Sequence, residues 1–191
     1  MHMVIVLGSP RVNGNSEILA RAVAEGVEKH GGTVEYFRLN KLSIRPCQGC
    51  GGCEKSGNCV ITDDMTPIYE RIDMADRLLV ATPIYFYAPS AQTKILIDRV
   101  QARWARRYTL RKRFRQGEGR RGYLLATAAT KGQKLFESSE LIVRYMLDAL
   151  DMEYGTPLLV SGVDARGAVQ EQHVLVDEAK AFGEKIGTGA I

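Results

Sequence analysis

The four cysteines of this 191-residue chain all lie in one short glycine-rich segment, PCQGCGGCEKSGNC. They are Cys47, Cys50, Cys53 and Cys59. Closely spaced thiols on such a segment can direct four sulfurs into one small volume, because glycines let the backbone curl around them. Soft thiolate ligands at this spacing favour an iron–sulfur cluster or zinc. The segment is therefore the first candidate for chemistry.

Three interpretations of the cysteines remain open on these residues alone. An iron–sulfur cluster suits four thiols on one loop. Zinc sites usually pair two CxxC motifs across a longer stretch, which this segment lacks. Free or redox-active thiols would need no metal. A disulfide framework is not expected, because we expect no signal peptide and the chain is long enough for an ordinary core.

A second polar segment, GSPRVNGNS, follows the first apolar run and has the features of a phosphate-binding loop. Its donors and its cation are Ser9, Arg11, Asn15 and Ser16. A helix expected to be capped by Ser16 adds free amides and a positive dipole end. The segment matches neither GxGxxG nor a Walker loop, so a dinucleotide or a nucleoside triphosphate fits poorly. The alternative is a plain turn before a well-capped helix.

The segment TPIYFYAPS places three consecutive aromatic residues, Tyr85, Phe86 and Tyr87, after an apolar run. Taken alone, such residues usually belong to a core. Beside a phosphate loop, they favour contact with a flat ring such as that of a flavin. A third loop at Thr130–Gly132 offers a further donor or charge near that ring.

Apolar runs separated by glycine and helix-capping signals predict five strands that alternate with helices. The expected strands are 3–9, 33–39, 77–83, 122–130 and 156–163. The expected helices begin near 16, 63, 90, 137 and 171. This order predicts an α/β fold, a doubly wound five-stranded parallel sheet with helices on both faces, in a single domain spanning 1–191. Ligands of such sheets bind at the carboxyl edge, where we also expect the cysteine loop 46–60, since it follows strand two.

The formal net charge of +4 hides a local basic excursion at 103–121, with nine basic residues and one acidic residue. The rest of the chain has 17 basic against 21 acidic residues. We expect the excursion to contact a second subunit, an acidic electron partner or the phosphates of a nicotinamide dinucleotide. Nucleic acid is not expected, because no recognisable nucleic-acid module accompanies it. No apolar run approaches a membrane span, and we expect a cytoplasmic protein without membrane contact.

The motifs GSPRxxGNS and TPIYFYAPS, with Asp98-Arg99 in the next helix, resemble those of the NADPH-dependent FMN reductase family, which is flavodoxin-like. The cysteine segment resembles that of its iron–sulfur flavoprotein branch. The resemblance implies FMN, a [4Fe–4S] cluster on the four cysteines, and a homodimer or homotetramer. The candidate cofactor-binding residues are Ser9, Arg11, Asn13, Asn15, Ser16, Pro83, Ile84, Tyr85, Phe86 and Thr130.

The function expected from this resemblance is an FMN-dependent oxidoreductase. It would pass electrons between a two-electron donor, NADH or NADPH, and one-electron acceptors. The acceptor would be a small redox protein or a small molecule. No side chain is assigned a catalytic role, because the cofactors carry the chemistry. The alternatives are a cluster-free NAD(P)H-dependent FMN or quinone reductase, a flavodoxin-like electron carrier, and a zinc-stabilised interaction module.

Overall fold

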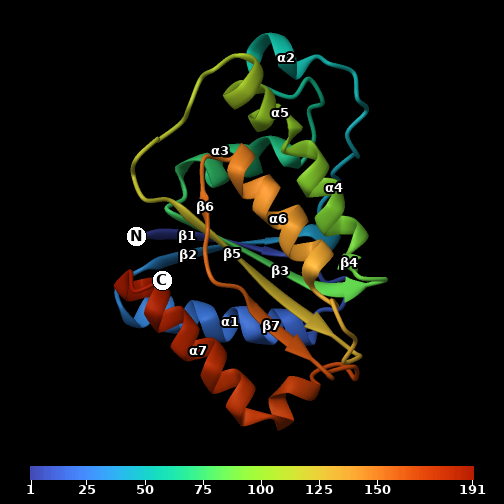
Figure 1. Cartoon of the computed structure of the whole chain (residues 1–191), viewed down its shortest axis with the longest axis vertical. Helices are drawn as coiled ribbons and strands as arrows, with labels where there is room; N and C mark the ends of the chain where they lie inside the picture. The colour runs from blue at the N-terminus through green and yellow to red at the C-terminus, as the bar shows by residue number, and fades with distance from the viewer.

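A parallel sheet runs through the middle of the computed structural model, which describes all 191 residues (Figure 1). Its strands pair in the order β2-β1-β3-β5, and two short strands share the next position beside β5. The strands are β1 (His2–Leu7), β2 (Thr33–Arg38), β3 (Arg77–Tyr85), β5 (Arg121–Ala128), β6 (Glu153–Tyr154) and β7 (Leu158–Ser161). The predicted flavodoxin-like sheet is confirmed, although its fifth strand is divided in two.

Helices cover both faces of the sheet (Figure 1). On one face lie α1 (Asn15–Lys29) and α7 (His173–Thr188), and on the other α3 (Met65–Met74), α4 (Ala91–Arg99) and α6 (Glu137–Ala149). Successive side chains of each buried strand point to opposite faces of the sheet, so alternate residues pack in the two cores. In β1, Ile5 belongs to the core under α1 and α7, whereas Val4 belongs to the core under the other helices.

Shorter elements complete the chain. They are η1 (Leu39–Lys41), α2 (Cys53–Ser56), β4 (Ala88–Pro89), α5 (Gln101–Trp104), the π-helical turn η2 (Ala105–Thr109) and η3 (Ala168–Glu171). Strand β4 pairs antiparallel with the end of β3, so the aromatic segment forms a hairpin in place of the predicted loop. Its turn residues, Phe86 and Tyr87, have φ values of 50° and 64°.

The two helix starts that flank the carboxyl edge differ in how they are capped. Ser90 caps α4 as serine commonly does, since its Oγ accepts a hydrogen bond from the amide of Thr93 at 3.3 Å. Ser16 was expected to cap α1, and this prediction is wrong. Gly14 is the N-cap, with extended backbone, and Ser16 already lies inside the first turn. No side chain therefore bonds the amides at the start of α1.

The end of β1 lies against the start of α4 because Gly8 has no side chain. The Ser90 hydroxyl donates to the carbonyl of Gly8 at 2.6 Å, and the Gly8 amide donates to Ala81 in β3 at 2.8 Å. A Cβ at Gly8 would lie 1.8 Å from Oγ1 of Thr93. This close approach holds the segment after β1 beside the hairpin after β3.

Candidate functional site

A cavity of about 250 Å³ lies where the loops after β1, β3, β5 and β7 meet. It brings together seven of the predicted cofactor-binding residues, namely Ser9, Arg11, Asn15, Ser16, Pro83, Ile84 and Tyr85. The two loops singled out in the sequence thus form one site at the carboxyl edge of the sheet. This is the edge at which ligands of doubly wound sheets bind.

The start of α1 provides the anion-binding end of this cavity. Ile18 makes the first main-chain bond of the helix, to Gly14, so the amides of the preceding turn have no acceptor there. Free amides and the positive end of the helix dipole attract an anion. Ser16, only 2% exposed, lines the cavity at this turn. Its hydroxyl adds a donor of the kind that phosphate oxygens accept.

Asn15 and Arg11 tie this loop to the segment after β7. The side-chain amide of Asn15 donates to the carbonyl of Ala165 at 3.0 Å and accepts from the amide of Val169 at 3.3 Å. Arg11 donates to the carbonyl of Asp164 at 3.2 Å. Asn15 therefore positions the loop, and its side chain is engaged within the protein.

Three other predicted cofactor residues lie outside the lining of this cavity. Asn13 is exposed and has a φ of 55°. Phe86 is fully exposed at the tip of the hairpin, and Thr130 is exposed beyond the end of β5. Asn13 and Phe86 follow expected strands and Thr130 ends one, but none of the three side chains lines the cavity.

Sequence reasoning missed other residues that line the cavity. They are Thr127, Ala129, Val163, Asp164 and Arg166. Arg166 is exposed and is the second cation of the lining, beside Arg11. The sequence contains a signal for two of them, because Asp164 and Arg166 come directly after the last predicted strand, 156–163, and so emerge at the carboxyl edge.

Glu17 is a fully buried carboxylate one residue beyond Ser16. Burial alone would raise the pKa of Glu17, but hydrogen bonds from Arg38, Arg21 and the amide of Asn13 lower it to about 2. The Asn13 amide donates to Oε2 at 2.8 Å. Glu17 therefore remains charged and holds the turn before α1 in its conformation, while two arginines balance its charge.

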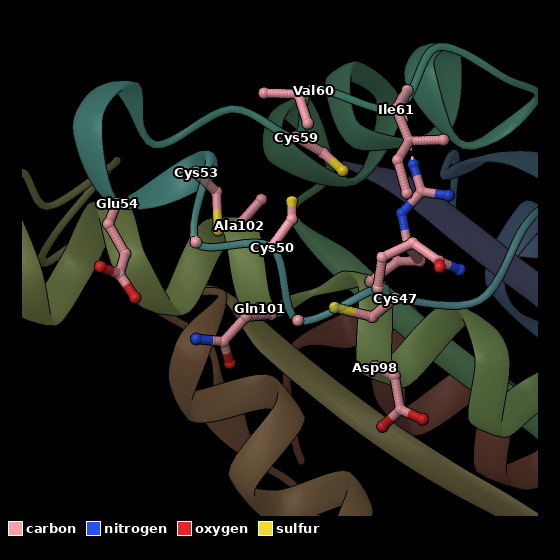
Figure 2. Close-up of a pocket in the computed structure, with 14 residues that line it drawn as sticks. Cys47, Cys50, Cys53, Glu54, Cys59, Val60, Ile61, Asp98, Gln101 and Ala102 are labelled. Atoms are coloured by element: carbon pink, nitrogen blue, oxygen red, sulfur yellow. Dashed lines mark hydrogen bonds between the residues drawn. The ribbon is translucent and has the colours of Figure 1, made fainter.

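A separate cavity of about 440 Å³ is lined by all four cysteines (Figure 2). Cys47, Cys50 and Cys53 come from the outgoing part of the loop and from α2, and Cys59 comes from the returning part. Cys53 and Cys59 also pack against the core under α3 and α6. The sulfurs share one cavity without converging closely enough to hold a single metal ion.

The chemistry of this cavity suits a polynuclear cluster better than one ion. Its only sulfur ligands are four soft thiols, and its volume far exceeds that of a single ion. Burial, followed by the charges of the other three cysteines, raises the pKa of the Cys53 thiol, so the four groups act on one another. Arg99 also lines the cavity, and its buried Nε has no hydrogen-bond partner. The residues present therefore fit an iron–sulfur cluster.

The predicted position of the cysteines at the flavin edge is wrong. The loop leaves the carboxyl edge and folds back over α4 and α5 (Figure 1). Two buried arginines in these helices hold it there. Arg99 donates to the carbonyls of Arg45 and Ile61, and Arg103 donates to the carbonyl of Gly57. As a result, the cysteine cavity and the cavity at the carboxyl edge share no lining residue.

Most of the charge of the basic excursion is neutralised within the chain. Six of its residues form ion pairs, namely Arg103, Arg106, Arg107, Arg113, Arg115 and Arg121. Arg120 is buried and donates instead to carbonyls at the carboxyl ends of α3 and α6, and burial lowers its pKa to about 10. Arg111 and Lys112 remain exposed without an ion pair. The excursion thus mainly joins other parts of the chain through ion pairs and hydrogen bonds at the amino edge of the sheet.

Comparison with known proteins identifies the family. The NADPH-dependent FMN reductase family model matches residues 1–164. The chain belongs to this family. The family predicted from the sequence is therefore confirmed. The cavity at the carboxyl edge contains the motifs by which the sequence resembled this FMN reductase family.

Curated proteins similar to this chain include several named iron–sulfur flavoprotein. One from Methanocaldococcus jannaschii is 35% identical over 99 residues, which are 52% of this chain and 51% of the relative. One from Archaeoglobus fulgidus is 32% identical over 150 residues, which are 78% of this chain and 73% of the relative. In three such relatives the match spans about half of the relative's length.

Solved structures support the fold of this FMN reductase family member. An NAD(P)H:quinone oxidoreductase from Methanothermobacter marburgensis has a TM-score of 0.76 at 21% identity, covering 97% of this chain and 96% of the other. A flavodoxin from the domain Archaea has a TM-score of 0.60 at 14% identity, covering 99% and 98%. Both likenesses show the flavodoxin-like fold. No helix of the chain is both long enough and apolar enough to cross a membrane.

Proposed function

We propose that residues 1–191 form one FMN-binding domain that passes electrons between a two-electron donor, NADH or NADPH, and one-electron acceptors through a [4Fe–4S] cluster. The observation that supports this most is the presence of two separate cavities in one chain. One has the donors and the helix terminus for a phosphate, and the other is lined by four cysteines.

FMN is proposed to occupy the cavity at the carboxyl edge. Its phosphate would be held by the free amides at the start of α1 with Ser9, Arg11 and Ser16, because donors and a cation gather at this end. Its ring would lie along Pro83–Tyr85, at the other end of the lining. When bound, FMN supplies the ability to accept a hydride and to release electrons singly.

The cluster is proposed to be held by Cys47, Cys50, Cys53 and Cys59. Four thiolates on one glycine-rich loop can ligate the four irons of such a cluster without a distant ligand. When bound, the cluster supplies a one-electron relay. The chain's own part is to hold the loop over α4 and α5 and to shield one side of it, because Cys53 and Cys59 pack against the core.

A cluster-free NAD(P)H-dependent FMN or quinone reductase is the second candidate. It is favoured by the arrangement of the thiols, since the four sulfurs do not converge on one point. In that case the cysteine loop would be a structural cover on α4 and α5. The homodimer or homotetramer, the acceptor and the cytoplasmic location expected from the sequence stay predictions.

Anaerobic rapid-mixing experiments test the electron path. NADH or NADPH should bleach the flavin absorbance at once, and a cluster signal in electron paramagnetic resonance should follow. Cys50→Ser should retain flavin reduction and lose the second signal, whereas Ser56→Ala, on the exposed side of α2, should retain both. A Cys50→Ser variant that transfers single electrons as fast as the parent would favour the cluster-free reductase.

A further inference from the structure

Arg99 is a buried cation, only 1% exposed, and all but one of its N–H donors have an acceptor within the protein. Nη1 donates to the carbonyl of Arg45 at 2.8 Å and to Oδ2 of Asp63 at 2.6 Å. Nη2 donates to the carbonyl of Ile61 and to Oδ1 of Asp63, both at 3.2 Å. These four bonds use the four hydrogens of the two terminal nitrogens.

The fifth donor of Arg99, its Nε–H, is buried and has no partner. An unsatisfied buried donor costs roughly 1–3 kcal/mol, so native proteins rarely leave one without a reason. Asp63 binds the edge formed by the two terminal nitrogens, and this leaves the Nε edge free for another acceptor. Arg99 lines the cavity that contains all four cysteines, so a sulfur bound in this cavity is an acceptor within reach of the same site.

Cys59 and Arg99 line the same cavity. Burial disfavours the charge of Arg99, but its hydrogen bonds to Asp63 raise its pKa. The Tyr69 hydroxyl donates to the carbonyl of Arg99 at 2.6 Å and so holds the main chain of this residue. The guanidinium, which carries a positive charge in proteins, is thereby fixed at the cysteine cavity.

We propose that Arg99 is a positioning residue that tunes the cysteine site: its free Nε–H donates to a sulfur of the bound cluster or of Cys59. This inference rests on the proposed cluster. A hydrogen bond and a positive charge beside a cluster stabilise its reduced, more negative state, and they raise its reduction potential. Asp63 opposes this effect, since its carboxylate partly cancels the charge of the guanidinium.

The two partners of the ion pair therefore have opposite effects on the potential, which a purely structural role would not produce. Arg99→Lys keeps a charge and removes the Nε–H donor, so the potential should fall. Asp63→Asn keeps an oxygen acceptor for Arg99 and removes the opposing charge, so the potential should rise. Arg103→Lys is the matched control, because Arg103 is also buried and holds the loop but does not line the cysteine cavity.

The test is a redox titration of the anaerobic holoprotein, followed by electron paramagnetic resonance. At a fixed solution potential near the parent midpoint, we expect the ratio of reduced to oxidised cluster to change about tenfold in Arg99→Lys, which is ~59 mV for a one-electron couple. Asp63→Asn should shift the ratio in the opposite direction, and Arg103→Lys should leave it unchanged. If Arg99→Lys does not fold, the sign of the Asp63→Asn shift decides.

Two results overturn the proposal, and they are distinguishable. A parent protein that binds no iron removes the proposed cluster, and the role of Arg99 falls with it. A parent that binds the cluster, with an unchanged or lowered potential in Asp63→Asn, removes the role of Arg99 alone and leaves the proposed function intact.

Discussion

Arg99 and Asp63 form a bidentate ion pair at the base of the cysteine loop. Its distances are 2.6 Å between Nη1 and Oδ2 and 3.2 Å between Nη2 and Oδ1. Both side chains are almost fully buried. Because Arg99 also binds carbonyls on the outgoing and returning parts of the loop, one residue of α4 joins both ends of the segment. The loop is thus a closed structure anchored on the helix layer.

Removing Asp63 should therefore destabilise the whole protein. Asp63→Ala leaves a buried guanidinium without its counter-charge, which costs on the order of 3–5 kcal/mol. Asp64→Ala is the matched control, because Asp64 is exposed and its side chain accepts a bond from the Ser43 amide at 2.6 Å. The control should lose about 1 kcal/mol. Urea unfolding of both variants measures the difference, and equal losses would mean that the ion pair is not what closes the loop.

Phosphate binding is tested by Arg11→Ala and Ser16→Ala. Each variant loses a charge-assisted hydrogen bond of roughly 1.5–3 kcal/mol, so the affinity for FMN should fall at least tenfold. The affinity for riboflavin, which has no phosphate, should change little. Thr130→Ala lies outside the cavity lining and should bind both flavins like the parent. Equal losses for FMN and riboflavin would argue that the phosphate lies elsewhere.

The contact between Gly8 and Thr93 predicts a coupled pair of substitutions. Gly8→Ala places a Cβ 1.8 Å from Oγ1 of Thr93, and this overpacking should cost about 1–3 kcal/mol and weaken flavin binding. Thr93→Ala removes the clashing atom, so the double variant should recover much of the loss. A double-mutant cycle of unfolding free energies measures the coupling. Strictly additive costs would contradict the close approach.

Glu17 predicts an acid-dependent loss of stability. Its pKa is lowered to about 2 in the folded protein from the ordinary glutamate value of 4.5. Its contribution is therefore fully present above pH 4.5 and is lost as the pH falls from 4.5 toward 2. A difference of this size corresponds to about 3 kcal/mol. Unfolding curves should show a smaller loss over this range in Glu17→Gln than in the parent, and parallel losses would contradict the assignment.

The exposed, unpaired charges of the basic excursion should affect electron transfer to an acidic partner. Its paired charges should affect the stability of the fold. Arg111 and Lys112 lack an ion pair, so replacing both with alanine should change the salt dependence of electron transfer to an acidic partner. Arg115 pairs with Asp76 at 2.6 Å, so Arg115→Ala should lower the melting temperature instead. Tight duplex DNA binding that weakens steeply with salt would support a nucleic-acid role.

The sequence predicts those features that depend on local pattern. The apolar strands, the Ser90 cap of α4 and the meeting of the loops after β1 and β3 follow from alternation, capping residues and sheet topology. The position of the cysteine loop does not, because it depends on Arg99 and Arg103, whose partners lie tens of residues away. The same holds for the basic excursion, since its carboxylate partners include Asp73 in α3 and Asp148 in α6, which are distant in the sequence.

The measurement that tests the central proposal most directly is the composition of protein purified entirely without oxygen. FMN, iron, acid-labile sulfide and zinc are to be quantified on one sample, together with its visible spectrum. The account predicts one flavin with about four irons and four sulfides per chain, and loss of the iron when Cys50 becomes serine. Flavin with full NAD(P)H oxidation and no iron, or zinc in equal amount to the chain, would contradict it.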